Sequence, residues 1–102
     1  MNIFNSIPEN LDVELIDVLV QTEHVKLERI ISKGHRSPDS GWYDQLHNEW
    51  VVVLKGEARI VFENDQELSL KAGSYLDIPA HTKHKVSWTN PQTETVWLAI
   101  HY

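Results

Sequence analysis

The chain has 102 residues, a formal net charge of −6 and an apolar fraction of 41%, and it contains no cysteine. This length supports one domain with a single core, and the missing thiols exclude a disulfide scaffold, a cysteine-based zinc site and a thiol nucleophile. A negative balance without a basic stripe argues against nucleic-acid binding. No apolar run reaches the roughly 20 residues of a membrane helix, and the first residues lack the pattern of a signal peptide. We therefore expect a cytoplasmic protein with no membrane or nucleic-acid partner.

The first part of the chain predicts a short lead-in followed by two strands. Residues 1–10 are expected to be a loosely ordered lead-in, and a single domain is expected to occupy 11–102. The segment 11–20 fits both a helical stripe and a strand face, and its β-branched residues favour the strand. Apolar residues alternate over 25–31, which predicts a second strand. The stretch GHRSPDSG at 34–41 is rich in turn-forming residues and predicts a loop.

The stretch GWYDQLHNEWVVVLKGE at 41–57 predicts a strand that ends near Gly56. Side chains of a regular strand alternate between its faces, so the odd-numbered polar residues share a face with Val51 and Val53, which enter the core. These polar residues are Tyr43, Gln45, His47 and Glu49. Burying a carboxylate is costly unless a hydrogen-bonded partner or a metal ion compensates it. This face therefore predicts a buried polar site.

The rest of the chain predicts further short strands separated by Gly, Pro and Asn turns. The alternating segments are 57–63, 67–71, 75–79, 84–89 and 95–101. About eight short strands with no long helix indicate an all-β sandwich or barrel. A small closed barrel has room inside for one ligand or one metal site, which gives the buried polar face a purpose.

The spacing of several residues resembles the two signature motifs of the cupin superfamily. In the first motif a glutamate is followed by six residues and a glycine, as Glu49 and Gly56 are here. In the second motif a glycine, a proline and a histidine follow one another at fixed spacing, as Gly73, Pro79 and His84 do here. The resemblance implies a small single-domain cupin, an all-β barrel of the double-stranded β-helix or jelly-roll type.

The resemblance covers 41–88, but the sequence departs from the family pattern at two expected metal ligands. The family's His-x-His pair falls at Tyr43 and Gln45. Of the four usual ligands, only Glu49 and His84 carry over. The alternative reading is that Glu49 is an ordinary ion-paired glutamate and His84 a core histidine.

The family nevertheless implies a divalent metal ion, either Fe, Mn, Ni or Zn, inside the barrel. Glu49 and His84 are its expected ligands, and the neutral amide oxygen of Gln45 is a weaker one. His35, in the loop before the motif, or His47, which shares the parity of Glu49, is the candidate second imidazole. Two nitrogens and a carboxylate form the usual open site for non-haem iron and related metals. The alternative for both histidines is a solvated position.

Further residues are candidates for the cavity wall or for a subunit interface. Tyr43 is predicted to line the cavity and to donate a hydrogen bond. Trp88 shares the strand parity of the motif histidine and is predicted to point into the barrel. His81 replaces the glycine of the second motif, in the turn from which it would reach the barrel mouth. A homodimer is expected, and exposure of Trp42 or Trp50 would indicate its interface.

Two functions remain open from the sequence. In the first, the barrel binds a divalent metal and a small organic ligand and acts as a metal-dependent dioxygenase or isomerase, with Glu49 and His84 as catalytic residues. In the second, the barrel is a non-catalytic metabolite-binding or sensing module without metal. A metal-free acid–base pair formed by Glu49 and His84 is a third arrangement, because the two groups would shift each other's pKa in a cavity of low dielectric.

Overall fold

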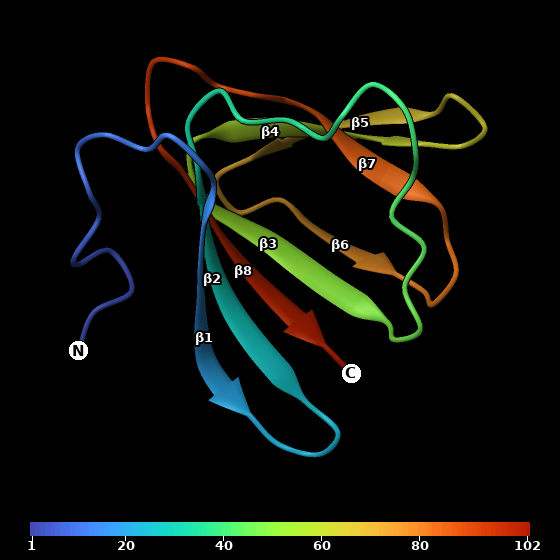
Figure 1. Cartoon of the computed structure of the whole chain (residues 1–102), viewed down its shortest axis with the longest axis horizontal. Helices are drawn as coiled ribbons and strands as arrows, with labels where there is room; N and C mark the ends of the chain where they lie inside the picture. Colours follow the sequence, from blue (N-terminus) through green and yellow to red (C-terminus); the bar gives the residue numbers. More distant parts are fainter.

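The computed structural model describes residues 1–102 and contains eight β-strands and no helix (Figure 1). The strands are β1 Leu15–Gln21, β2 Lys26–Ser32, β3 Glu49–Lys55, β4 Glu57–Phe62, β5 Glu67–Lys71, β6 Tyr75–Ile78, β7 His84–Thr89 and β8 Thr95–His101. The all-β prediction is confirmed, and most of these bounds follow the alternating segments of the sequence. The structure has no helix that would be able to span a membrane.

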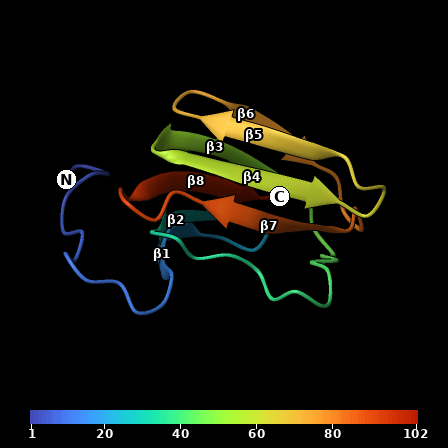
Figure 2. The ribbon, with the colours of Figure 1, turned by 90° about the horizontal axis from the view of Figure 1, so that it is seen from above.

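The strands form two antiparallel sheets that face each other (Figure 2). The larger sheet has the order β1-β2-β8-β3-β6, and the smaller sheet has the order β5-β4-β7. Strands β3 and β4 follow each other directly in sequence but belong to different sheets. The chain therefore crosses from one layer to the other within a single residue.

That residue is Gly56, and its conformation explains why the motif has a glycine there. Its φ is +91°, and a Cβ atom at this position would lie 2.5 Å from Thr95 Oγ1. Any other residue would meet both an unfavourable backbone conformation and a steric clash. The Glu57 N–H donates to Thr95 Oγ1 at 3.2 Å, and the Thr95 hydroxyl donates to the Glu57 carbonyl at 3.1 Å. The crossing is thus fixed by β8.

The hydrophobic core lies between the two sheets. Alternation along β3 and β4 sends every second side chain into this space. The buried cluster consists of Val51, Val53, Ala58, Ile60, Leu70, Ile78 and Trp97. The polar residues on the same strand faces cannot join this cluster without partners, and they gather around a cavity beside it.

The N-terminal segment is held against the face of the large sheet that points away from the cavity. Arg29 is 7% exposed and donates hydrogen bonds to the carbonyls of Ile3 at 3.0 Å and Asn5 at 2.5 Å. Its Nε also donates to Asp17 Oδ2 at 3.0 Å. Residues 1–14 contain no strand, so the predicted first strand begins four residues later than expected, at Leu15.

The segment between β2 and β3 runs along the free edge of β7 (Figure 1). Tyr43 and His84 exchange two backbone hydrogen bonds, of 2.8 and 3.2 Å, and the Ser37 N–H donates to the Val86 carbonyl at 2.9 Å. The regular strand predicted from residue 41 does not form, because Tyr43 makes only an isolated bridge and ladder pairing begins at Glu49. This segment closes one side of the barrel.

Candidate functional site

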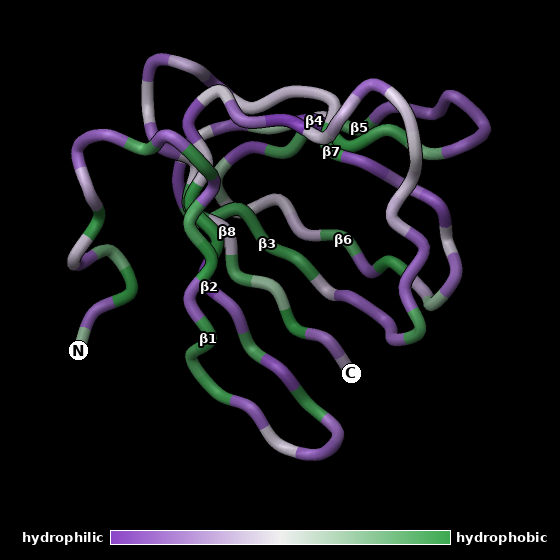
Figure 3. The backbone as a smooth tube through the Cα atoms, viewed as in Figure 1, coloured by the Kyte–Doolittle hydropathy of each residue, from purple (hydrophilic) through white to green (hydrophobic).

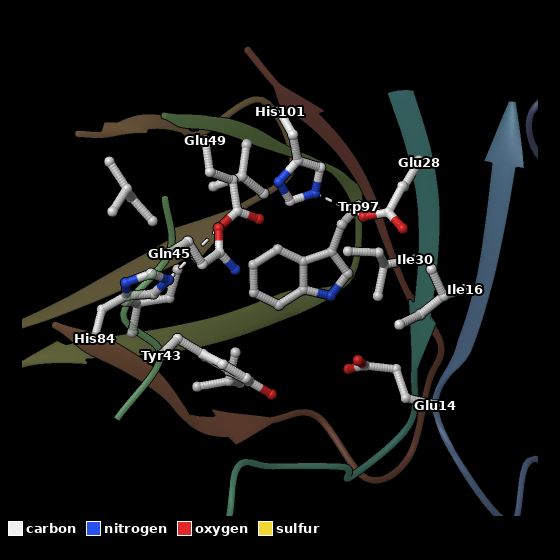
Figure 4. Close-up of a pocket in the computed structure, with 14 residues that line it drawn as sticks. Glu14, Ile16, Glu28, Ile30, Tyr43, Gln45, Glu49, His84, Trp97 and His101 are labelled. Atoms are coloured by element: carbon white, nitrogen blue, oxygen red, sulfur yellow. Dashed lines mark hydrogen bonds and ion pairs between the residues drawn. The ribbon is translucent and has the colours of Figure 1, made fainter. Parts of the chain in front are cut away.

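A cavity of about 170 Å³ lies between the two sheets and is lined by 14 residues (Figure 4). Its polar and aromatic lining consists of Glu14, Glu28, Tyr43, Gln45, Glu49, His84, Trp97 and His101. Aliphatic side chains from both sheets form the remaining wall. An engineered cavity of roughly 150 Å³ binds benzene, so this cavity has room for a molecule with a single ring.

Glu49 and His84 face each other across the cavity and join its two layers (Figure 4). Glu49 begins β3 of the large sheet, and His84 begins β7 of the small sheet. His84 Nε2 lies 3.5 Å from Glu49 Oε1, and the two side chains are 6% and 13% exposed. His84 Nδ1 lies 2.8 Å from the Thr82 carbonyl oxygen. Since a carbonyl oxygen can only accept a hydrogen bond, Nδ1 must donate it. The proton of the neutral ring is therefore assigned to Nδ1, and Nε2 faces Glu49.

The surroundings of His84 favour its protonated form. Burial alone would lower the pKa of His84, because it disfavours the charged imidazolium. The contact with Glu49 and the hydrogen bond to Thr82 act in the opposite direction and outweigh burial, so the pKa of His84 is raised above 6.5. A buried imidazole whose pKa is raised by a neighbouring carboxylate is suited to acid–base chemistry.

A second histidine–carboxylate pair, which was not predicted from the sequence, lines the far side of the cavity. His101 Nε2 lies 2.6 Å from Glu28 Oε1, and the side chains are 16% and 12% exposed. The two residues come from neighbouring strands, β8 and β2, of the large sheet. Lys26 Nζ approaches the other oxygen of Glu28, at 3.8 Å. The alternation of Trp97, Ala99 and His101 along the last strand was the available signal for His101.

Trp97 stands between the two pairs, with its indole ring in the middle of the cavity (Figure 4). The residue is 3% exposed, and its Nε1 has no hydrogen-bond partner. Glu14 lies on the side of the cavity toward which Nε1 points (Figure 4), and its carboxylate accepts a hydrogen bond from the Ser32 hydroxyl at 2.8 Å. An unsatisfied buried donor costs about 1–3 kcal/mol, so an acceptor atom placed here is favoured.

Four of the residues singled out in the sequence line this cavity. They are Tyr43, Gln45, Glu49 and His84. Tyr43 is 46% exposed, and the centroid of its ring lies 5.7 Å from that of His84. It therefore stands at the rim of the cavity, beside the imidazole.

The two histidines that were expected to complete a metal site lie elsewhere. His35 stays in its own loop, where its Nδ1 accepts a hydrogen bond from the Lys33 N–H at 2.9 Å. His47 is exposed and lines a separate groove, because residues 44–48 bend and do not keep the strand parity. No group of three histidine, aspartate or glutamate side chains is placed to hold a metal ion. The donor set thus does not fit the open site of two imidazoles and one carboxylate.

Trp88 faces away from the cavity, which corrects its predicted orientation. The register of β4 with β7 shifts so that Ile60 pairs with Val86 while Arg59 pairs with Trp88. One extra residue, Ser87, thus reverses the alternation between Val86 and Trp88. The Arg59 guanidinium lies 4.8 Å from the centroid of the Trp88 ring, outside the barrel.

His81 does not line the cavity either. It is exposed, and its Nδ1 lies 2.9 Å from Asp44 Oδ1. Its φ is +62°, in the left-handed region that favours glycine. The turn after Pro79 therefore keeps the backbone conformation that suits the motif glycine, although the side chain here is an imidazole.

Comparisons with known proteins agree in pointing to one family. The family model described as "Cupin domain" matches residues 30–101. A structure from Ralstonia eutropha JMP134, named as a "putative mannose-6-phosphate isomerase", is 40% identical over 99% of this chain and 94% of that chain, with a TM-score of 0.95.

More distant structures share the fold. A cupin superfamily protein from Desulfitobacterium hafniense DCB-2 is 23% identical, covers 93% of this chain and 82% of that chain, and has a TM-score of 0.76. An RmlC-like cupin from Desulfovibrio desulfuricans is 19% identical, covers 99% of this chain and 93% of that chain, and has the same TM-score of 0.76. A search of the curated proteins finds no match.

Proposed function

Since the chain belongs to the cupin domain family and has its all-β fold, we propose that its barrel binds a small organic molecule and transfers a proton through Glu49 and His84. The reaction class is an isomerisation that needs no metal ion. The observation that carries the proposal is the 3.5 Å separation of Glu49 Oε1 and His84 Nε2 inside the cavity. At this distance neither group fully satisfies the other, so both are available to a bound molecule.

The pair supplies both groups that such a reaction requires. For a substrate with a carbonyl next to a hydroxylated carbon, Glu49 removes the proton from that carbon while His84 donates a proton to the carbonyl oxygen. The product of this step is an enediol. Glu49 then returns its proton to the former carbonyl carbon, and His84 takes the proton of the other hydroxyl. The carbonyl has moved by one carbon, and both groups have regained their starting protonation.

The likeness to the Ralstonia protein supports the reaction class. That protein is 40% identical over almost the whole chain, and its name is that of an isomerase. The raised pKa of His84 also supports it, because the Glu49 carboxylate and the Thr82 carbonyl favour the imidazolium that donates the proton. A non-catalytic binding module would require the same cavity but not this pair.

Metal dependence is not part of the proposal, although cupins often bind metals. The cavity brings together Glu49 and His84 with the neutral amide of Gln45. The remaining imidazole of the cavity, His101, is already bonded to Glu28 at 2.6 Å. The expected site for Fe, Mn, Ni or Zn therefore lacks its second imidazole, and the proposed reaction contains no dioxygenase step.

Proton exchange with solvent tests the proposal directly. Simple aldoses and ketoses, with and without phosphate, are incubated with the protein in heavy water, and loss of their carbon-bound protons is followed by NMR. Wild-type protein is expected to catalyse exchange with at least one sugar in the presence of EDTA. Glu49→Gln should reduce the rate at least about 100-fold.

The matched control is Glu63→Gln, which alters a glutamate that is paired with Lys83 at 3.3 Å and is 60% exposed. It should leave the exchange rate unchanged. Exchange that appears only after a divalent metal is added, or that survives intact in Glu49→Gln, would contradict the proposal, as would the absence of exchange from every sugar tested.

We also propose a homodimer, in which the second copy covers the apolar side chains of β1. Trp42 and Trp50 are both half-buried, so the proposal does not rest on them. Strand β1 is instead the outer edge of the large sheet, and hydrophobic residues follow it (Figure 3). Four of its seven residues are exposed hydrophobic ones, namely Ile16, Val18, Leu19 and Val20. Such a strip on an edge strand favours association.

A further inference from the structure

Building on the proposed function, we infer that the cavity selects an uncharged or positively charged molecule that is rich in hydroxyl or ammonium groups. It discriminates against phosphorylated sugars. An unphosphorylated sugar and an amino sugar share the required chemistry. This substrate class differs from the one in the name of the Ralstonia protein.

The charges that face the cavity carry the first part of the inference. Three carboxylates line it, those of Glu14, Glu28 and Glu49, and neither lysine nor arginine does. Even with the imidazoles of His84 and His101 both protonated, the lining keeps one net negative charge. Phosphate sites in proteins are built from arginine, lysine or helix N-termini, and this chain contains no helix.

One lysine approaches this lining from outside and does not alter the balance. Lys26 Nζ lies 3.8 Å from Glu28 Oε2, and Lys26 itself is not among the lining residues. Its side chain is 39% exposed, so solvent screens its charge. A phosphate dianion in the cavity would therefore be repelled by the carboxylates without a compensating cation. Hydroxyl or ammonium groups would instead donate hydrogen bonds to these carboxylates.

Trp97 carries the second part of the inference, independently of the acidic groups. Its indole N–H is buried and has no partner, and it lies on the side of the ring nearer Glu14 (Figure 4). Because this group only donates, the bound molecule must present an acceptor atom to it. A hydroxyl group both accepts and donates, so a polyhydroxylated ring can satisfy Trp97 and the carboxylates together.

The size of the cavity is that of a molecule with one ring. Its volume is about 170 Å³, close to the roughly 150 Å³ of a cavity that binds benzene. Ile30 and Val51 contribute to its apolar wall, which can cover the face of a ring. A monosaccharide without a phosphate arm matches this space and this lining.

The indole N–H of Trp97 provides the readout. Its resonance is assigned in a proton–nitrogen correlation spectrum by its loss in Trp97→Phe, and the full chain is titrated with mannose, glucosamine and mannose 6-phosphate. The titrations are done at about pH 6.5, where the amine of glucosamine is protonated, since the lining keeps a net negative charge even when both imidazoles are protonated. Mannose or glucosamine should move this resonance at millimolar concentration, and mannose 6-phosphate should bind at least about 10-fold more weakly. Tighter binding of glucosamine than of mannose would show that the cavity prefers a positively charged sugar. Tighter binding of mannose would show that it prefers an uncharged one.

Two variants test the electrostatic cause. Glu14→Gln and Glu28→Gln should each reduce the preference for mannose and glucosamine over mannose 6-phosphate. Glu63→Gln, which lies outside the cavity, should not change this preference. The inference is overturned if mannose 6-phosphate binds as tightly as the two other sugars, or if neither of those moves the Trp97 resonance. Sugar binding at Trp97 without proton exchange would contradict the proposed reaction only, and proton exchange on a phosphorylated sugar alone would contradict this inference only.

Discussion

Two histidine–carboxylate pairs share one cavity, and they differ in geometry and in their place in the fold. Glu28 and His101 belong to neighbouring strands of one sheet and lie 2.6 Å apart. Glu49 and His84 belong to opposite sheets and lie 3.5 Å apart. The first distance is that of a strong hydrogen bond, and the second is too long for one.

This difference separates a structural role from a chemical one. Glu28 and His101 satisfy each other and tie β2 to β8 at the side of the cavity. Glu49 and His84 leave each other incompletely satisfied, and the His84 ring is held by the Thr82 carbonyl at its other nitrogen. Glu49 and His84 are therefore called the open pair, because they are held in position without a strong hydrogen bond between them, and Glu28 and His101 are called the closed pair. The open pair is the one that can exchange a proton with a bound molecule. The same residue types thus acquire different roles through the strands that present them.

The two pairs should differ most in how much stability is lost when the carboxylate of each is removed. Glu28→Ala leaves the His101 imidazole without its buried partner and should lower the free energy of unfolding by about 1–3 kcal/mol. Glu49→Ala breaks a contact of 3.5 Å, which is too long for a strong hydrogen bond, and should cost less than Glu28→Ala. Urea unfolding of both variants measures the two values. Equal losses would remove the distinction between a closed pair and an open one.

The pH dependence of stability should report on the pair of Glu49 and His84. The pKa of His84 is raised in the folded protein, so its contribution is fully present below about pH 6.5, where the unfolded imidazole is also protonated. It is lost as the pH rises through the folded pKa of His84. The stability difference between wild type and Glu49→Gln should therefore shrink with increasing pH. An NMR titration of the His84 ring should give a lower midpoint in Glu49→Gln, and an unchanged midpoint would contradict this assignment.

A substitution on the edge strand β1 of the large sheet is expected to have the smallest effect on the two histidine–carboxylate pairs. Leu19→Lys, at a position that is 46% exposed on β1, should shift a dimer toward monomer by placing a charge on the edge strand. Tyr75→Lys is the matched control, since Tyr75 is 69% exposed on β6, at the opposite edge. Light scattering after size-exclusion chromatography measures the mass. Proton exchange at Glu49 and His84 should persist in both variants, and a monomeric wild type would contradict the proposed assembly.

Much of the fold was predictable because strand alternation and turn chemistry are local. The segments 67–71, 84–89 and 95–101 agree with the strands of the structure. The motif spacing around Glu49 and Gly56 also identified one wall of the cavity and the residue at which the strand ends. These features depend on neighbours in the chain, which a sequence displays directly.

The sequence by itself determined an all-β chain with Glu49 and His84 on two of its strands. Only the tertiary structure decided what accompanies them. The bend at 44–48 and the extra residue at Ser87 broke the strand parity on which His47 and Trp88 had been placed. Glu28 and His101, 73 positions apart, meet only because β2 pairs with β8. Strand pairing is set by which apolar faces can be buried together across the whole chain, and no local pattern of residues records it.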